Sequence, residues 1–209
     1  MYTPSAFRVE SQAKIADFIR RHSFATLVTH DDSGSFASHL PLLYHADGGN
    51  GTLIGHMARA NKQWKHFENG GEVLVIFQGP HAYISPTWYE SSPNVPTWNY
   101  AVVHAYGIPA VVEDPERLSA IIDETVANYE GNPLPVPADF RDKLMLAIVG
   151  FEIPISRIEA KFKLGQNRQP ADLRGIYQAL SRSAEEGDRA LAALMLAEGN
   201  VSPSSTASP

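Results

Sequence analysis

Apolar residues recur at helical spacing near both ends of the chain and at strand spacing between them. Ile15, Phe18 and Ile19 share one face of a helix that we predict over 12–22, with Ser11 as its N-cap. Runs rich in β-branched and aromatic residues predict strands at 24–29, 35–44, 52–57, 72–79, 81–85 and 99–114. Other patterns predict helices at 61–68, 115–130, 171–183 and 185–197, and a short helix that runs into strands over 140–166.

The order of these elements predicts the fold class. Tight turns such as DDSGS (31–35) and HADGGNG (45–51) join the early strands, and strands do not alternate regularly with helices. This order argues against a doubly wound parallel sheet and favours a mainly β protein with helices (α+β), built on an antiparallel barrel. We expect a barrel domain over 1–169, a C-terminal helical appendage over 170–197 and a disordered, Ser/Pro-rich tail over 198–209.

The composition excludes several kinds of functional site. The 209 residues include no Cys, which excludes disulfides, zinc–thiolate sites and Cys nucleophiles. The formal net charge of −6 gives the chain as a whole no attraction for nucleic acid, so DNA binding would need a local basic patch or a groove made by a dimer. No apolar run reaches the length of a membrane span, and the N-terminus has no basic segment followed by an apolar core. We therefore expect a cytoplasmic protein without membrane contact.

The stretch GHMARANKQWK (55–65) is the first candidate site. A strand is predicted to end near Met57 and a helix to begin near Asn61, with Arg59 and Lys62 at the junction. Helix N-termini bind anions through free N–H groups, an Arg can bond two phosphate oxygens at once, and a Lys adds a compact charge. The stretch therefore predicts a phosphate site, and solvated surface charges are the competing interpretation.

Two further stretches suit a flat heterocycle. SHLPLLY (38–44) places Pro41 inside a strand, which indicates an edge, a bulge or a gap that leaves backbone groups free for a ligand. KFKLGQNRQ (161–169) ends a strand with cations and amides together: Lys161, Lys163, Gln166, Asn167 and Arg168. Amide side chains can bond both the carbonyl and the nitrogen atoms of a ring. An ordinary edge proline and a basic strand end are the competing interpretations.

The loop over 86–98 is unusually aromatic. It carries the triplet PTW twice and includes Trp88, Tyr89 and Trp98. Long ordered connections are often functional, so we expect these side chains to shield a flat cofactor or to pack at a subunit interface. Ordinary packing of the loop against its own barrel is the competing interpretation.

The eight histidines form no zinc motif, because there is neither an HExxH sequence nor a pair at i, i+4 with a neighbouring carboxylate ligand. A histidine could still bond a cofactor or ligate haem, and His56 and His104 are the two residues considered for haem.

Several stretches together resemble the PaiB family of FMN-binding negative transcriptional regulators, which is similar in fold to the pyridoxamine-phosphate-oxidase group. The resemblance rests on motifs in the family's order: HLPLLY (39–44), GHMARANKQW (55–64), VPTWNYAVVHAYG (95–107), IVGFEI (148–153) and KFKLGQNR (161–168). The last motif departs from the expected KLSQNR, because Gly165 replaces the Ser. The resemblance implies an FMN-binding split β-barrel that dimerises with FMN at the interface, and a role in transcription that gives DNA as a partner.

On this resemblance we expect the FMN phosphate near Arg59, Asn61 and Lys62 and the ring against the backbone of the 38–44 strand. The full set of expected cofactor residues is Ser38, His39, Leu40, His56, Arg59, Asn61, Lys62, Thr97, Trp98, Asn99, Gln166, Asn167 and Arg168. No catalytic residue is assigned. A flavin-dependent oxidoreductase of the same fold is the alternative function, and a haem-binding or haem-degrading split barrel is a more distant one.

Overall fold

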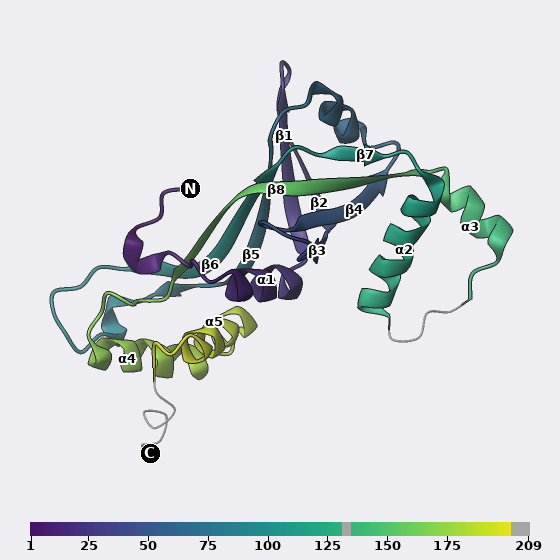
Figure 1. The fold of residues 1–209 in the computed structure, drawn as a ribbon. Coiled ribbons are helices and arrows are strands. Elements are labelled where there is room, and N and C mark those ends of the chain that lie inside the picture. Colours follow the sequence, from purple (N-terminus) through teal and green to yellow (C-terminus); the bar gives the residue numbers. More distant parts are fainter. Residues whose placement is uncertain (131–134, 202–209) are drawn as a thin grey trace. The chain divides into compact units, whose positions relative to one another are not determined.

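The structure, a computed structural model, describes residues 1–130 and 135–201 (Figure 1). Within these residues the helices are α1 (Gln12–Arg21), α2 (Pro115–Tyr129), α3 (Ala138–Met145), α4 (Pro170–Ser181) and α5 (Glu186–Ala197), with 3₁₀ helices η1 (Ser5–Phe7), η2 (Lys62–Asn69) and η3 (Pro86–Trp88). The strands are β1 (Phe24–Asp31), β2 (Gly34–Pro41), β3 (Leu43–His45), β4 (Thr52–Ala58), β5 (Val73–Ile84), β6 (Thr97–Gly107), β7 (Ala110–Val112) and β8 (Ile148–Lys163).

The strands form one eight-stranded sheet with the order β2-β1-β5-β6-β8-β4-β3, and β7 pairs with β8. The pairs β1–β2, β1–β5, β3–β4, β4–β8 and β7–β8 are all antiparallel. The β1–β2 hairpin closes at the predicted DDSGS turn and sets Leu27 opposite Ser38. The prediction of an α+β protein built on an antiparallel sheet is confirmed.

Helix α1 follows the predicted pattern closely. The Ser11 hydroxyl accepts a hydrogen bond from the Lys14 N–H at 3.4 Å, which satisfies one of the free donors of the first turn. Ile15, Phe18 and Ile19 are buried on the inner face of the helix. Burial of an aliphatic or aromatic side chain of this size contributes about 1.5–3 kcal/mol, so this apolar face, rather than helix propensity, holds α1 in place.

The chain divides into two compact units that do not follow the sequence in order. Unit 1 contains Met1–Glu10, Gln78–Val102 and Glu159–Pro209, and unit 2 contains Ser11–Phe77 and Val103–Ile158. Strands β5, β6 and β8 therefore contribute residues to both units. The boundary between the predicted domains at 169/170 stays a prediction, and of the predicted tail only residues 198–201 are described.

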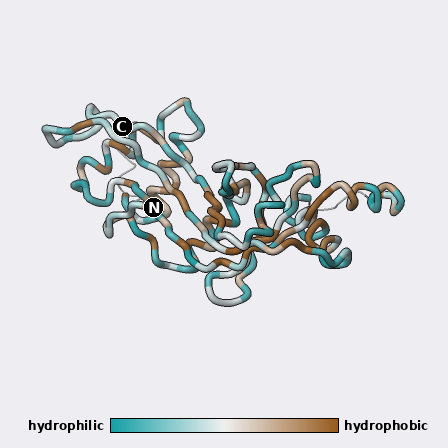
Figure 2. The backbone as a smooth tube through the Cα atoms, turned by 90° about the horizontal axis from the view of Figure 1, so that it is seen from above, coloured by the Kyte–Doolittle hydropathy of each residue, from teal (hydrophilic) through white to brown (hydrophobic). Residues whose placement is uncertain are grey.

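Each unit has its own buried apolar residues. In unit 2 these include Leu27, Val75, Phe77 and Phe151, which are fully buried. In unit 1, α4 and α5 lie side by side and bury apolar side chains such as Ile176, Leu180, Leu191 and Met195. Hydrophobic stretches, brown in Figure 2, alternate with hydrophilic teal ones along the chain, as expected of elements with one buried face.

Several predicted strand boundaries are wrong, and the predicted strand at 99–114 is divided into β6 and β7 around Pro109. The predicted strands at 72–79 and 81–85 form the single strand β5, although Gly79 and Pro80 lie inside it. Strand β1 pairs with β5 only at Leu74–Ile76, so the missing N–H of Pro80 costs no bond to β1. Conversely, the predicted strand at 35–44 is divided into β2 and β3, because the Leu42 N–H donates to the Ser23 carbonyl at 2.9 Å instead of to a neighbouring strand.

Candidate functional site

The junction between β4 and η2 in unit 2 brings two predicted site residues together. Asn61 is the N-cap of η2, and its side-chain oxygen accepts from the Gln63 N–H at 3.1 Å. The amide nitrogen of the same side chain donates to the Ser38 hydroxyl of β2 at 2.8 Å. One residue therefore caps the helix and joins it to the hairpin, and it directly precedes Lys62, the first residue of η2.

A buried glutamine that the sequence interpretation overlooked holds η2 in place. The Gln63 side chain is fully buried, and its amide nitrogen lies 3.0 Å from the Leu27 carbonyl, 3.2 Å from the Thr29 hydroxyl and 3.2 Å from the Phe36 carbonyl. Its own oxygen has no partner within the described residues. The only signal in the sequence is its place beside Trp64 and near Phe67, the large apolar residues of the helix predicted at 61–68. Phe67 is buried there, whereas Trp64 is half-buried.

The two cations of this junction, Lys62 and Arg59, differ in their hydrogen bonds. Lys62 is exposed and has no hydrogen-bond or ion-pair partner in the described parts of the chain. Arg59 is also exposed, but its Nε donates to the Leu146 carbonyl at 3.0 Å and one terminal nitrogen donates to the Ile148 carbonyl at 2.8 Å. A guanidinium has five N–H donors, so Arg59 is anchored and still keeps donors for an anion.

His56 of β4 lines a cavity of about 720 Å³ next to this junction. Most of the lining is apolar and comes from α2, α3 and the beginning of β8. Ala58 and Ile148 belong to the lining, so the cavity borders the carbonyls that hold Arg59. The His56 Nδ1 atom is buried without a partner among the described residues, and burial lowers the pKa of this imidazole.

Strand β2 carries the remaining predicted residues of unit 2. His39 faces away from Ser38, with its Nδ1 atom 3.0 Å from the Thr26 hydroxyl, and Leu40 is half-buried. Because β2 is the first strand in the sheet order, one of its edges has no strand partner within the described residues. Of the interpretations of Pro41 as part of an edge, a bulge or a gap, the structure shows the edge, which an ordinary edge proline also explains. The free edge leaves backbone groups available to a ligand.

In unit 1 most of the predicted residues are bonded to residues outside the predicted set. The Lys163 ammonium donates to the Thr97 hydroxyl and, at 2.7 Å, to the Trp98 carbonyl. Burial lowers the pKa of Lys163, and the neighbouring charges of Lys161 and Arg168 lower it further. Lys163 was named in the basic motif but omitted from the predicted site, and in the structure it connects the ends of β6 and β8.

Arg168 and Gln166 are likewise engaged within unit 1. Arg168 donates to the Asn94 side-chain oxygen at 2.8 Å and lies 4.8 Å from the ring centre of Tyr89. The Gln166 amide nitrogen donates to the Phe162 carbonyl, and its oxygen accepts from the Leu164 N–H at 2.8 Å. Asn167 is exposed. The two Gln166 bonds stabilise the turn after β8, and the Arg168 bond joins this turn to the aromatic loop.

Asn99 is the exception in unit 1. Its side chain is only 2% exposed, yet the amide nitrogen has no partner within the described residues. Trp98, the preceding residue of β6, points outward with 54% of its surface exposed and lies near the rings of His81 and Tyr83. An unpaired amide and an exposed aromatic group therefore lie on one strand.

A buried carboxylate also holds the aromatic loop. Asp172 of α4 is 2% exposed and accepts from the N–H groups of Glu90 and Ser91, each at 2.9 Å, and from the Ser91 hydroxyl at 2.7 Å. These donors, the Ser91 hydroxyl above all, keep the pKa of Asp172 below its ordinary value. The loop is thus fixed to the C-terminal helical pair within unit 1.

Comparisons with known proteins show which family the chain resembles. The family described as "Putative FMN-binding domain" matches residues 1–157. Protease synthase and sporulation protein PAI 2 of Bacillus subtilis is 37% identical over 200 residues, which are 93% of this chain and 96% of that protein.

Two solved structures show the fold. Flavocytochrome Anf3 from Azotobacter vinelandii has a TM-score of 0.60 at 14% identity, over 75% of this chain and 69% of that one. The FAD and heme binding protein from Mycobacterium smegmatis has a TM-score of 0.58 at 15% identity, over 76% of this chain and 74% of that one.

No helix among the described residues is long and apolar enough to cross a membrane.

The residues of unit 2 fit an FMN molecule. Lys62 offers an unpaired charge beside the capped start of η2, which suits a phosphate group. His56 lines a mostly apolar cavity and has a buried Nδ1 atom without a partner among the described residues, which suits a flat heterocycle with polar atoms at its rim.

Proposed function

Since the chain belongs to the FMN-binding family that includes PAI 2 of Bacillus subtilis, and is thus a flavin-binding split-barrel protein, we propose that it is an FMN-dependent negative regulator of transcription. The observation that supports the regulatory part is the 37% identity over 93% of the chain to a protein named for protease synthesis and sporulation. When bound, FMN supplies a redox-active ring, whereas the protein supplies position and electrostatics.

The phosphate end of FMN is the part of the proposal that the structure supports best. The proposed ligands are Ser38, Arg59, Asn61 and Lys62, all within unit 2. The observation that carries the assignment is the unpaired ammonium of Lys62 at the first residue of η2, next to the Ser38–Asn61 hydrogen bond. Charge-assisted hydrogen bonds to phosphate are about twice as strong as neutral ones, so Lys62 should contribute much of the affinity.

The other predicted contacts remain part of the proposal with less support. For the ring we propose the free edge of β2 at Ser38, His39 and Leu40, together with His56. Of the unit 1 residues, Asn99 is the strongest candidate for a flavin contact, because its amide nitrogen is buried and unpaired.

We propose a homodimer for the working protein. Trp98 and Tyr83, 54% and 46% exposed, form an aromatic patch of unit 1 with His81. Aromatic side chains of this size are enriched at subunit interfaces. Light scattering on the FMN-loaded protein should give twice the mass of one chain, and Trp98→Ser should shift the equilibrium toward monomer. A monomeric mass for the wild type at micromolar concentration would refute the dimer.

The regulatory role is tested by transcript profiles in the source organism. Deletion of the gene should raise the transcripts of a limited set of genes. The wild-type gene should restore repression, and the Asn61→Ala/Lys62→Ala variant should fail to do so if FMN is required. An unchanged profile after deletion would rule out the regulatory role. Because the net charge is −6, direct DNA contact is examined separately, by salt-dependent retention of genomic fragments on the purified protein.

Haem binding is a second candidate function, and the environment of His56 favours it. Of the two histidines considered from the sequence, His56 lines a mostly apolar cavity, and its buried Nδ1 atom has no hydrogen-bond partner among the described residues. His104 contacts the ring of Tyr106 and does not line this cavity. A Soret band after haem addition that is lost in His56→Ala would support this role. Absence of the band in the wild type would eliminate it.

A further inference from the structure

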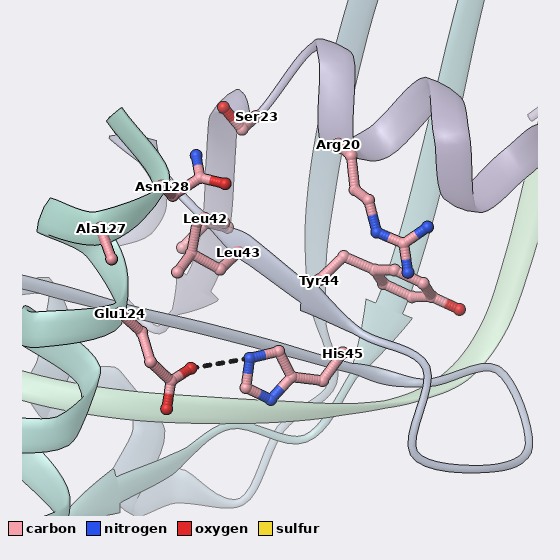
Figure 3. Close-up of a pocket in the computed structure, with 9 residues that line it drawn as sticks. All are labelled: Arg20, Ser23, Leu42, Leu43, Tyr44, His45, Glu124, Ala127 and Asn128. Carbon is pink, nitrogen blue, oxygen red and sulfur yellow. Dashed lines mark ion pairs between the residues drawn. The ribbon is translucent and has the colours of Figure 1, made fainter. Parts of the chain in front are cut away.

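A second pocket of unit 2, of about 380 Å³, contains none of the residues expected to bind FMN (Figure 3). It lies where the end of α1, the segment from Leu42 through β3 and the last turns of α2 come together. Leu42, Leu43 and the ring of Tyr44 form its apolar part, and Arg20, His45 and Glu124 supply charged or titratable groups. Its volume falls in the range of small-molecule sites.

Arg20 is the cation of this pocket without an acidic partner. Its guanidinium carbon lies 5.3 Å from the centre of the Tyr44 ring, and no carboxylate pairs with it in the described parts of the chain. The adjacent Arg21 differs, because it forms an ion pair with Asp17 on the outer face of the same helix. The stacked guanidinium of Arg20 is therefore oriented but still has donors for an anion.

The acid of the pocket, Glu124, already has two partners. One oxygen of Glu124 lies 2.8 Å from the His45 Nε2 atom, and the other lies 3.2 Å from Arg117, which also binds Glu152. The carboxylate orients the imidazole through Nε2, and the His45 side chain lines the pocket. Glu124 thus acts as a positioning residue for His45, and Arg117 is shared between Glu124 and Glu152, so the free charge that the pocket offers to an anion is that of Arg20.

The helix ends limit the charge of the ligand. Both α1 and α2 end at this pocket, at Arg21 and Tyr129, and the C-terminal end of a helix carries a partial negative charge. A doubly charged phosphate is therefore disfavoured, whereas a singly charged carboxylate can pair with Arg20. A hydroxyl on the same ligand could donate to His45 or to the Asn128 side chain, which also lines the pocket.

We propose that this pocket binds a small organic monocarboxylate, such as an aromatic or hydroxy acid, as an effector separate from FMN. The carboxylate pairs with Arg20, the apolar body lies against Leu42, Leu43 and Tyr44, and a polar substituent bonds His45. The proposal depends on neither the regulatory role nor the FMN phosphate site.

The test uses the FMN-loaded protein and four probes of similar shape: benzoate, 3-hydroxybenzoate, neutral benzamide and cationic benzamidine. Calorimetric or ligand-observed NMR titration should show binding of the two acids, with benzamide and benzamidine at least about tenfold weaker, the effect of one charge-assisted contact. Arg20→Gln should weaken benzoate binding about tenfold. The matched variant Arg21→Gln, one residue away with the same change of charge, should stay within about twofold of the wild type.

Three results would overturn the proposal. The first is a wild-type protein that binds benzamide or benzamidine as well as benzoate, and the second is an equal loss in Arg20→Gln and Arg21→Gln. The third is no benzoate binding by a wild-type protein that retains FMN. The flavin content of each variant, read from its absorption spectrum, separates this failure from a failure of the FMN assignment.

Discussion

Two basic groups in this molecule look alike in the sequence and differ in the structure. In unit 2, Lys62 is exposed and unpaired, and Arg59 is anchored with donors to spare. In unit 1, Lys163 and Arg168 are bonded to Trp98 and Asn94. The Lys163 ammonium has two of its three N–H donors bonded to its own chain, whereas all three donors of Lys62 are available to a ligand. Arg59 and Arg168 both keep unused donors, so the two lysines carry the comparison. We therefore propose ligand binding for the unit 2 group and a structural role for Lys163.

The largest expected effect comes from Arg59→Ala, because Arg59 should both stabilise the fold and bind the FMN phosphate. Loss of the bonds to the Leu146 and Ile148 carbonyls should lower the free energy of unfolding by about 2 kcal/mol, the range for hydrogen bonds to charged groups. FMN affinity should fall at least about tenfold. Urea unfolding of the apoprotein and flavin titration measure the two effects. Lys65→Ala, an exposed cation of η2, is the control and should change the stability by less than about 0.5 kcal/mol.

Lys163→Ala should separate the two basic groups. The variant loses the bonds to Thr97 and the Trp98 carbonyl, so stability should fall by about 1–2 kcal/mol. The FMN dissociation constant should stay within about threefold of the wild type. A tenfold loss of FMN affinity at unchanged stability would instead make the unit 1 group a ligand site and reverse the comparison.

Gly165→Ser tests the departure from the family motif. Gly165 has φ of +90°, and a Cβ atom there would lie 2.9 Å from Leu173 Cδ2. We expect a loss of about 1–2 kcal/mol, because a side chain is strained in this backbone conformation. Gly71→Ser, where a Cβ atom meets nothing within 4 Å, is the matched control. A stabilised Gly165→Ser variant would show that the turn accepts the family's serine without strain.

Asp172→Asn should give the smallest effect, a change in pH dependence. Because the folded-state pKa of Asp172 is lowered, its contribution is fully present above the unfolded pKa of about 3.9 and is lost as the pH falls through the folded value. The wild type should therefore be more stable than the variant at pH 6. This advantage should shrink in urea titrations below pH 4, and a difference that is constant with pH would contradict the account.

The sequence predicted elements better than it predicted which polar groups are free. The cap at Ser11, the turn at 31–35 and the edge at Pro41 depend on neighbours in the chain, and all three appear in the structure. The continuity of β5 through Pro80 could not be predicted, because it depends on where β1 stops pairing.

The same limit applies to the candidate site. Lys62 and Lys163 are equally basic in the sequence, and only tertiary contacts show that Lys163 bonds to Trp98, 65 residues away. Gln63 had no signal beyond its place next to an apolar face, since its three partners lie on a distant hairpin. The pocket at Arg20 could not be predicted from the sequence, because its residues come from three separate segments.

The most direct measurement is the titration of wild type and Lys62→Ala with FMN and with riboflavin, which lacks the phosphate, followed by flavin fluorescence. We predict that Lys62→Ala weakens FMN binding about ten- to a hundredfold and changes riboflavin binding less than about threefold. Equal losses for the two flavins, or no loss for FMN, would contradict the placement of the phosphate at the start of η2.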